Sequence, residues 1–159
     1  MIGSLVATEL QDAAALAGSV HMTGIETKIF GALAARLDAF VSAYPIDVAY
    51  PNINFMPRPR MPYLRPWMLP APTISASLIA PGSMDFKGIF QIDVFWPAGQ
   101  GLIQALEKSA AIIAHFATTR LIYQDGFAVQ INEAPYASPA MQEPGWVHIP
   151  VSIRFRAFA

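Results

Sequence analysis

The stretch that decides the fold is Gly88-Ile-Phe-Gln-Ile-Asp-Val-Phe-Trp-Pro-Ala-Gly-Gln-Gly101. Apolar side chains alternate along it, a pattern that indicates a β-strand with one buried face. We expect the core side to carry Phe90, Ile92, Val94 and Trp96, and the other side to carry Gln91, Asp93 and Phe95. Asp93 is interpreted as a residue of a solvated face. The proline and glycine after Trp96 end the strand and lead into a helix.

A second long strand is expected near the end of the sequence, in Met141-Gln-Glu-Pro-Gly-Trp-Val-His-Ile-Pro-Val-Ser-Ile-Arg-Phe-Arg-Ala157. Its alternation is regular, so one face is buried and the other is wet or touches a partner. The inward set is Val147, Ile149, Val151, Ile153 and Phe155, and the outward set is His148, Ser152, Arg154 and Arg156.

Two amphipathic helices accompany these strands. The first begins near Thr23, which forms a capping-box pattern with Glu26, and Pro45 ends it. Its apolar residues recur every four positions, at Ile25, Ile29, Leu33, Leu37 and Val41. In the second helix the expected buried stripe is Leu102, Leu106, Ala110 and Ile113, with Ile103 and Phe116 beside it.

This order of elements predicts an α+β domain over residues 23–159, with a mostly antiparallel sheet and two main helices packed on one face. Residues 1–22 show no sustained pattern and are assigned as an N-terminal extension. The extension either contacts another subunit or is a frayed tail.

The middle of the chain is rich in proline: residues 45–81 hold nine of the fourteen prolines. Such a segment cannot be helical, and it cannot be a run of central strands. Residues 63–69 resemble a strand, which Pro66 restricts to an edge or a bulge. Residues 73–80 alternate well enough for a further strand.

A basic cluster lies in this proline-rich region. Arg58, Arg60 and Arg65 are interleaved with Tyr63 and Trp67. One interpretation is a surface that touches DNA or an acidic neighbour, since arginine suits phosphate contacts. The alternative is a solvated loop with no partner. Two arginines on the outward face of the last strand complete the candidate interaction residues, Arg58, Arg60, Arg65, Trp67, Arg154 and Arg156.

Composition limits the possible functions. Hydrophobic residues make up 54% of the 159 residues and charged residues only 13%, which favours apolar surface in subunit contacts or, alternatively, an alanine-rich core. No stretch reaches the roughly 20 apolar residues of a membrane span. A net charge of −1 gives no broad footprint for nucleic acid, and the absence of cysteine excludes disulfides. We expect the protein to be synthesised in the cytoplasm.

No catalytic pattern is present in the sequence. The three histidines, His21, His115 and His148, have no partner at metal-ligand spacing. Asp93 and Glu143 are conceivable as paired carboxylates, but nothing in the sequence places them together. We therefore predict that the protein is not an enzyme and needs no cofactor or metal ion.

Several phrases of the sequence resemble the tail terminator family of lambda-like siphophages and related prophages. They are Ala49-Tyr-Pro-Asn52, Tyr63-Leu-Arg65, Gln91-Ile-Asp-Val-Phe-Trp-Pro-Ala-Gly99, and Gly145-Trp146 leading to Ile149-Pro-Val-Ser-Ile153. The resemblance runs from about Gly24 to Ala157. The chain departs from it at Pro66, where an uninterrupted strand is expected, and in the first twenty-odd residues.

The resemblance implies a small α+β virion protein made in the bacterial host cytoplasm. Family members form a hexameric ring on the last ring of tail tube protein, stop tube growth, and offer a surface to head-completion proteins while DNA passes through the lumen. A head-closure or neck connector and a diverged tail tube protein are the alternatives within the virion. A small enzyme or ligand-binding domain outside any virion is the alternative from another class.

Overall fold

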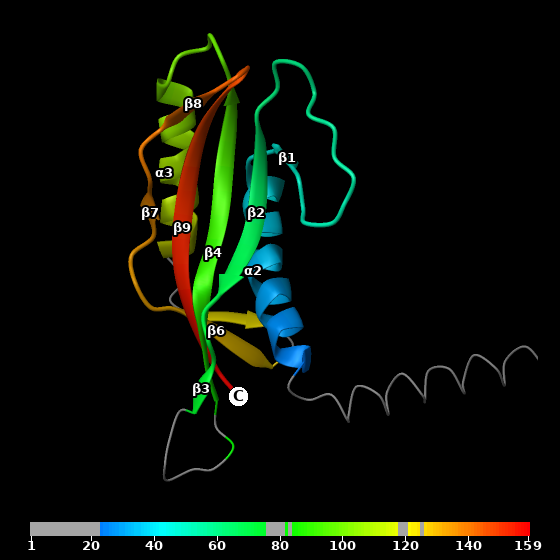
Figure 1. The fold of residues 1–159 in the computed structure, drawn as a ribbon, viewed down its shortest axis with the longest axis vertical. Helices are drawn as coiled ribbons and strands as arrows, with labels where there is room; N and C mark the ends of the chain where they lie inside the picture. Colours follow the sequence, from blue (N-terminus) through cyan, green and yellow to red (C-terminus); the bar gives the residue numbers. More distant parts are fainter. Residues whose placement is uncertain (1–22, 76–81, 83, 118–120, 125) are drawn as a thin grey trace, which may run out of the picture.

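The computed structural model describes residues 23–75, 82, 84–117, 121–124 and 126–159. The expected N-terminal extension and most of the expected strand at 73–80 lie outside these ranges. Three long strands form the centre of the sheet: β2 (Tyr63–Pro70), β4 (Met84–Pro97) and β9 (Trp146–Phe158). β4 lies between the other two and is antiparallel to both (Figure 1).

Six short strands complete the sheet. β6 (Phe127–Ile131), β7 (Tyr136–Ala137) and β8 (Met141–Glu143) pair in succession along the outer edge of β9. β5 (Leu121–Gln124) pairs with β6, and β3 (Ile74–Ser75) pairs with β4. β1 (Asp47–Val48) is parallel to β2 and all the other pairings are antiparallel. The prediction of a mostly antiparallel sheet is therefore confirmed, and the parallel β1–β2 pairing makes the sheet a mixed one.

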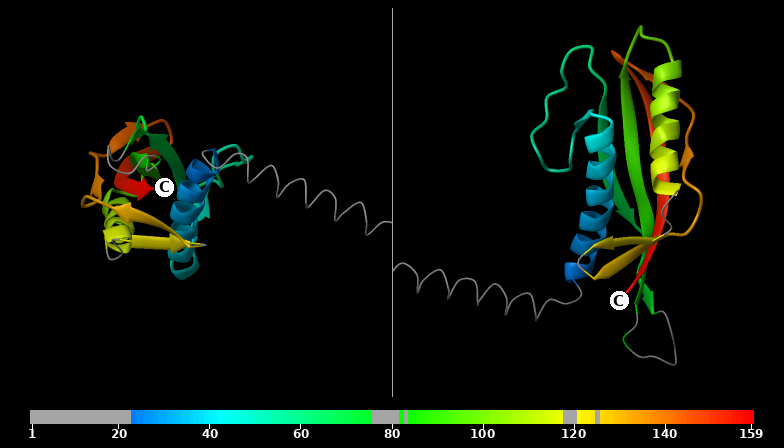
Figure 2. Two further views of the ribbon diagram at one scale, coloured as in Figure 1. Left: turned by 90° about the horizontal axis from the view of Figure 1, so that it is seen from below. Right: turned by 180° about the vertical axis from the view of Figure 1, so that it is seen from behind.

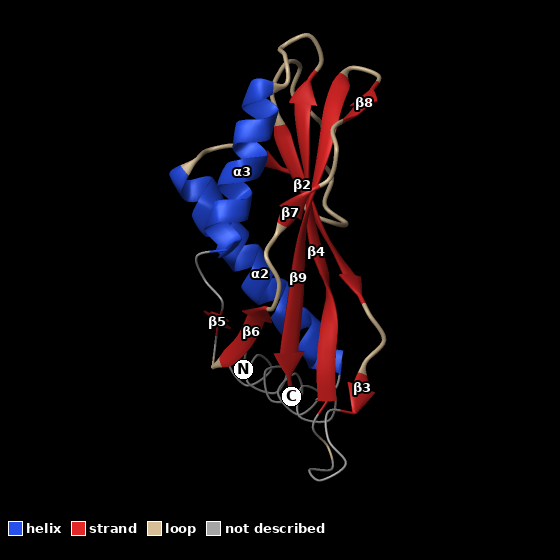
Figure 3. Cartoon of the chain, turned by 90° about the vertical axis from the view of Figure 1, so that its left-hand side faces the viewer, coloured by secondary structure: helices blue, strands red, loops and turns tan. Residues whose placement is uncertain are grey.

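Two helices cover one face of this sheet, α2 (Thr23–Ala43) and α3 (Ile103–Ala117). Figure 3 shows both helices on the same side of the long strands, and Figure 2 shows them from behind the sheet. α2 ends two residues before Pro45, as the sequence predicts. Its predicted stripe is confirmed, because the side chains of Ile25, Ile29, Leu33 and Leu37 are buried in the core.

The predicted stripe of α3 is wrong at Leu102, Leu106 and Ala110, which are exposed, whereas Phe116 is buried and Ile113 packs partly buried against the core. The buried residues of this helix are Ala105, Ser109, Ile112 and Phe116. Small side chains at Ala105 and Ser109 allow the helix to approach the sheet closely. The Ser109 hydroxyl needs no external partner because it donates to the Ala105 carbonyl at 2.9 Å.

As a result, two large aliphatic side chains of α3, Ile103 and Leu106, point outward. Ile103 is 73% exposed, Leu106 47% and Leu102 41%.

The core face of the long strands agrees with the sequence. Phe90, Ile92 and Val94 of β4 are fully buried and Trp96 is nearly so. In β9 the inward residues Ile149, Val151, Ile153 and Phe155 are buried and Val147 is partly buried. No helix in the described ranges is both long enough and apolar enough to span a membrane.

Candidate interaction surface

The expected edge strand is confirmed in β2. β1 pairs only with Tyr63 and Leu64, so the outer edge of β2 beyond Leu64 has no partner strand among the described residues. Residues 49–62 leave β1 as a long loop that projects beside this edge (Figure 1). The loop turns at Asn52, whose φ of 57° is the left-handed conformation that asparagine tolerates.

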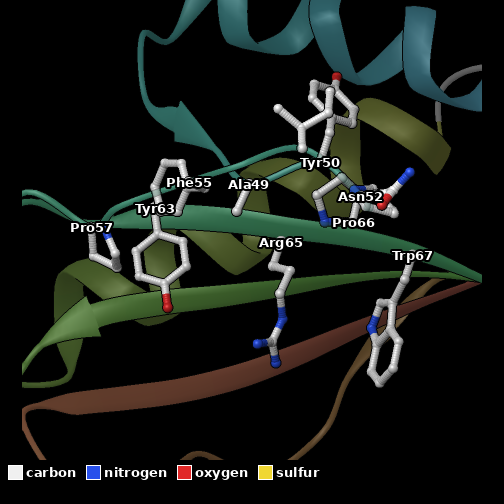
Figure 4. A pocket seen from close by; sticks show the side chains of 11 residues that line it. Ala49, Tyr50, Asn52, Phe55, Pro57, Tyr63, Arg65, Pro66 and Trp67 are labelled. Atoms are coloured by element: carbon white, nitrogen blue, oxygen red, sulfur yellow. The ribbon is translucent and has the colours of Figure 1, made fainter.

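A cleft of about 410 Å³ lies between this loop and β2. Figure 4 shows Tyr63, Arg65 and Trp67 pointing to the same side of the strand. Phe55, from the loop, packs on Tyr63 with ring centroids 5.0 Å apart. We call this the β2 cleft; it is lined by Ala49, Tyr50, Pro51, Asn52, Ile53, Phe55, Pro57, Tyr63, Arg65, Pro66 and Trp67.

On the face of the sheet away from the helices, a charged and aromatic group forms around Asp93. Asp93 is fully buried, so its assignment to a solvated face is wrong. It accepts a hydrogen bond from Gln91 at 2.7 Å and lies 3.4 Å from the guanidinium of Arg65. A buried carboxylate needs such partners, and here Gln91 comes from the same strand, β4, and Arg65 from the neighbouring strand β2.

His148 of β9 pairs with Phe95 of β4 and lies on the outward face that the sequence predicts, but its side chain is buried there. Its Nδ1 lies 3.1 Å from Glu143, and its Nε2 lies 3.1 Å from Asp93. The contact with Asp93 is close enough for an ion pair but is not aligned as a hydrogen bond. His148 thus joins two carboxylates that sequence reasoning could not place together.

Aromatic rings complete the group. Phe95 stacks between Tyr63, at a centroid distance of 4.7 Å, and His148, at 4.5 Å. Trp146 packs edge-on against Tyr63, and burial raises the pKa of the Tyr63 hydroxyl. We call this the outer-face group; it consists of Tyr63, Arg65, Gln91, Asp93, Phe95, Glu143, Trp146 and His148.

The structure separates the six predicted interaction residues. Arg65 and Trp67 both line the β2 cleft, and the Arg65 guanidinium lies 5.8 Å from the Trp67 ring centroid. Arg58 lies on the adjoining loop, where a two-bond contact with Asp47 at 2.7 Å raises its pKa. Arg60, on the same loop, makes no ion pair with a described residue.

Arg154 and Arg156 lie on β9, away from the β2 cleft. Arg154 is exposed and pairs with Glu133 at 3.2 Å. Arg156 is half-buried and holds Asp85 through two bonds of 2.8 and 2.9 Å. That contact, together with Lys87, keeps the pKa of the Asp85 carboxyl below its usual value. Most of the predicted positive charge is therefore neutralised within the chain.

Sequence reasoning missed Asp93, Glu143 and His148 as a joined group. Alternation along a strand shows which residues share a face, but a polar face can be either solvated or covered. Among the described residues, no cluster of three or more histidine, aspartate or glutamate side chains is placed to hold a metal ion.

Comparisons with known proteins agree with this description. The model of a family described as phage tail terminator protein matches residues 28–155. One solved structure is similar, with 25% sequence identity and a TM-score of 0.69. The similarity covers 83% of this chain and 94% of that one. Among curated proteins, no sequence matches. Because the family model spans most of the chain, this protein belongs to the phage tail terminator family and is a structural protein of the phage tail.

Proposed function

We propose that the protein forms a ring, hexameric by the family resemblance, that caps the tail tube, ends its polymerisation and provides the surface that joins the head. Family membership supports the tail role. One geometric observation supports assembly: α3 leaves the aliphatic side chains of Ile103 and Leu106 exposed one turn apart. With Leu102, which lies just before the helix, Ile103 and Leu106 form a small apolar patch, and contiguous exposed apolar surface marks contact sites.

Ring formation would multiply such contacts. Six weak contacts made together act as one multivalent event, so a modest surface on each copy suffices. One face of the ring would meet the last ring of tube protein and the other the head-completion protein. DNA would cross the lumen, and Arg60 is the candidate for a phosphate contact because its charge is not neutralised by a described residue.

The test is the distribution of tail lengths in lysates that lack this gene, measured by negative-stain microscopy. Over-long tails without heads are expected. Tails of normal length without heads would instead indicate a head-closure protein, and absent tails a tube protein. Joined particles with normal tails would contradict every virion role at the neck.

Complementation links the role to α3. We expect Ile103→Ser with Leu106→Ser to restore neither tail length nor head joining, although the purified variant melts like the wild type. Glu107→Ala, on the exposed side of the same helix, is the matched control and should complement fully. If the double serine variant complements as well as this control, α3 is not the assembly surface.

A further inference from the structure

Among the described residues, the outer edge of β2 is the open edge of the three long strands. On the opposite side, β6, β7 and β8 pair in turn with the outer edge of β9. On β2, the partner strand β1 covers only Tyr63 and Leu64. An unpaired edge of this kind is a template for another strand.

Two hydrogen bonds show which backbone groups of β2 point outward. Ala49 N–H donates to the Leu64 carbonyl at 2.7 Å, so Leu64 faces β1. Ala71 N–H donates to the Lys87 carbonyl at 2.8 Å, so Ala71 faces β4. Because the two directions alternate along a strand, the even-numbered residues 64–70 face the outer edge.

The outward positions after Leu64 are residues 66, 68 and 70, and two of them are proline. Proline has no backbone N–H, so Met68 alone offers a donor over this length. The effect is visible in β1. Its next rung would require residue 66 to donate to the Ala49 carbonyl, and β1 ends at Val48.

We propose that Pro66 and Pro70 close the outer edge of β2 to strand addition by a second copy of the chain. An incoming antiparallel strand could donate to the carbonyls of residues 66, 68 and 70. Two of its own carbonyls would face a proline nitrogen and lose their donors, which makes the pairing unfavourable.

The side chains on this edge explain why protection is needed. Trp67 is 41% exposed and Leu69 43%, so without the prolines β2 would combine an open edge with apolar side chains. That combination predicts edge-to-edge aggregation. Copies of the chain therefore associate through other surfaces, and the sheet does not extend from copy to copy through β2.

The test restores the missing donors in the purified full chain. Pro66→Thr/Pro70→Thr and Pro70→Thr alone are compared with Pro57→Thr/Pro59→Thr, which removes two prolines from the exposed loop and leaves β2 unchanged. Size-exclusion chromatography with light scattering gives the mass, and thioflavin T fluorescence reports cross-β assembly, in which sheets extend from chain to chain. Melting curves confirm that each variant is folded.

The double variant in β2 is expected to form large assemblies that bind thioflavin T, at concentrations where the wild type and the loop control keep their mass. Pro70→Thr alone should shift the mass in the same direction. Folded variants of wild-type mass at every concentration would overturn the proposal. If the double variant assembles only as it unfolds, Pro70→Thr alone decides, because residue 70 is exposed and the single variant is expected to stay folded. Assembly of folded Pro70→Thr would support the proposal, and its absence would overturn it. These assembly measurements do not depend on the tail-length phenotype, which tests the proposed function separately.

Discussion

Arg36 of α2 and His115 of α3 each hydrogen-bond the backbone of the other. The Arg36 guanidinium donates to the His115 carbonyl at 2.7 Å, and His115 Nε2 donates to the Arg36 carbonyl at 2.7 Å. These two part-buried hydrogen bonds tie the helices to each other. Burial lowers the pKa of His115 from its ordinary value of 6.5, and the bond to Arg36 opposes this only in part.

The lowered pKa of His115 predicts a pH dependence. Below about pH 6.5 the unfolded chain binds a proton at this site more readily than the folded chain does, so stability falls as pH decreases toward the folded pKa. His115→Gln keeps a donor but does not titrate. The unfolding free energy of the wild type, relative to this variant, should decrease between about pH 7 and pH 5 in urea titrations. A constant difference across this range would show that His115 is not the titrating group.

Asp93 is expected to be more important for stability than an exposed acidic residue. Asp93→Ala removes the partner of Gln91, Arg65 and His148, and loss of one member of a buried charged group costs about 3 kcal/mol. Thermal unfolding measures the loss. Asp47→Ala, which breaks the exposed pair with Arg58, is the control and should scarcely change melting. Equal effects of the two substitutions would contradict the buried group.

Gly88 is predicted to tolerate no side chain. A Cβ there would lie 2.6 Å from the Leu69 carbonyl oxygen and 2.7 Å from the Phe155 ring. Gly88→Ala should therefore destabilise the fold by about 1–3 kcal/mol through overpacking.

Gly31, in α2, is the matched glycine, because a Cβ there meets nothing within 4 Å. Gly31→Ala should raise stability by up to about 1 kcal/mol, since alanine favours helix. Chemical denaturation of both variants tests the pair. Opposite signs are expected, and a harmless Gly88→Ala would show that β2 and β4 are spaced differently.

The orientation of α3 is tested by two aliphatic residues of that helix. Ile112 is fully buried, so Ile112→Ala should cost about 2–5 kcal/mol. Leu106 is 47% exposed, and Leu106→Ala should change the stability of the separate chain by about 0.5 kcal/mol or less. If Leu106→Ala lowered the melting temperature more than Ile112→Ala, the buried side of α3 would be the one predicted from the sequence.

The sequence by itself determined those helices and strands whose hydrophobic pattern or proline positions allow a single secondary structure. The apolar side of β4 around Phe90 and Ile92 and the end of α2 before Pro45 follow from local rules, because a strand alternates with period two and proline cannot continue a helix. The edge position of β2 followed from Pro66 for the same reason. Short sequence phrases in β2 and β4, among them Tyr63-Leu-Arg65, also carried the family resemblance.

Tertiary structure alone decided which of two plausible faces is buried. α3 has apolar residues on both sides, and close approach to the sheet selected the side with small Ala105 and Ser109 over the side with Ile103 and Leu106. Asp93 and His148 became buried because strands distant in sequence brought partners to them. Local periodicity contains no information about such partners, and the free energy of burying a polar group depends on whether they are present.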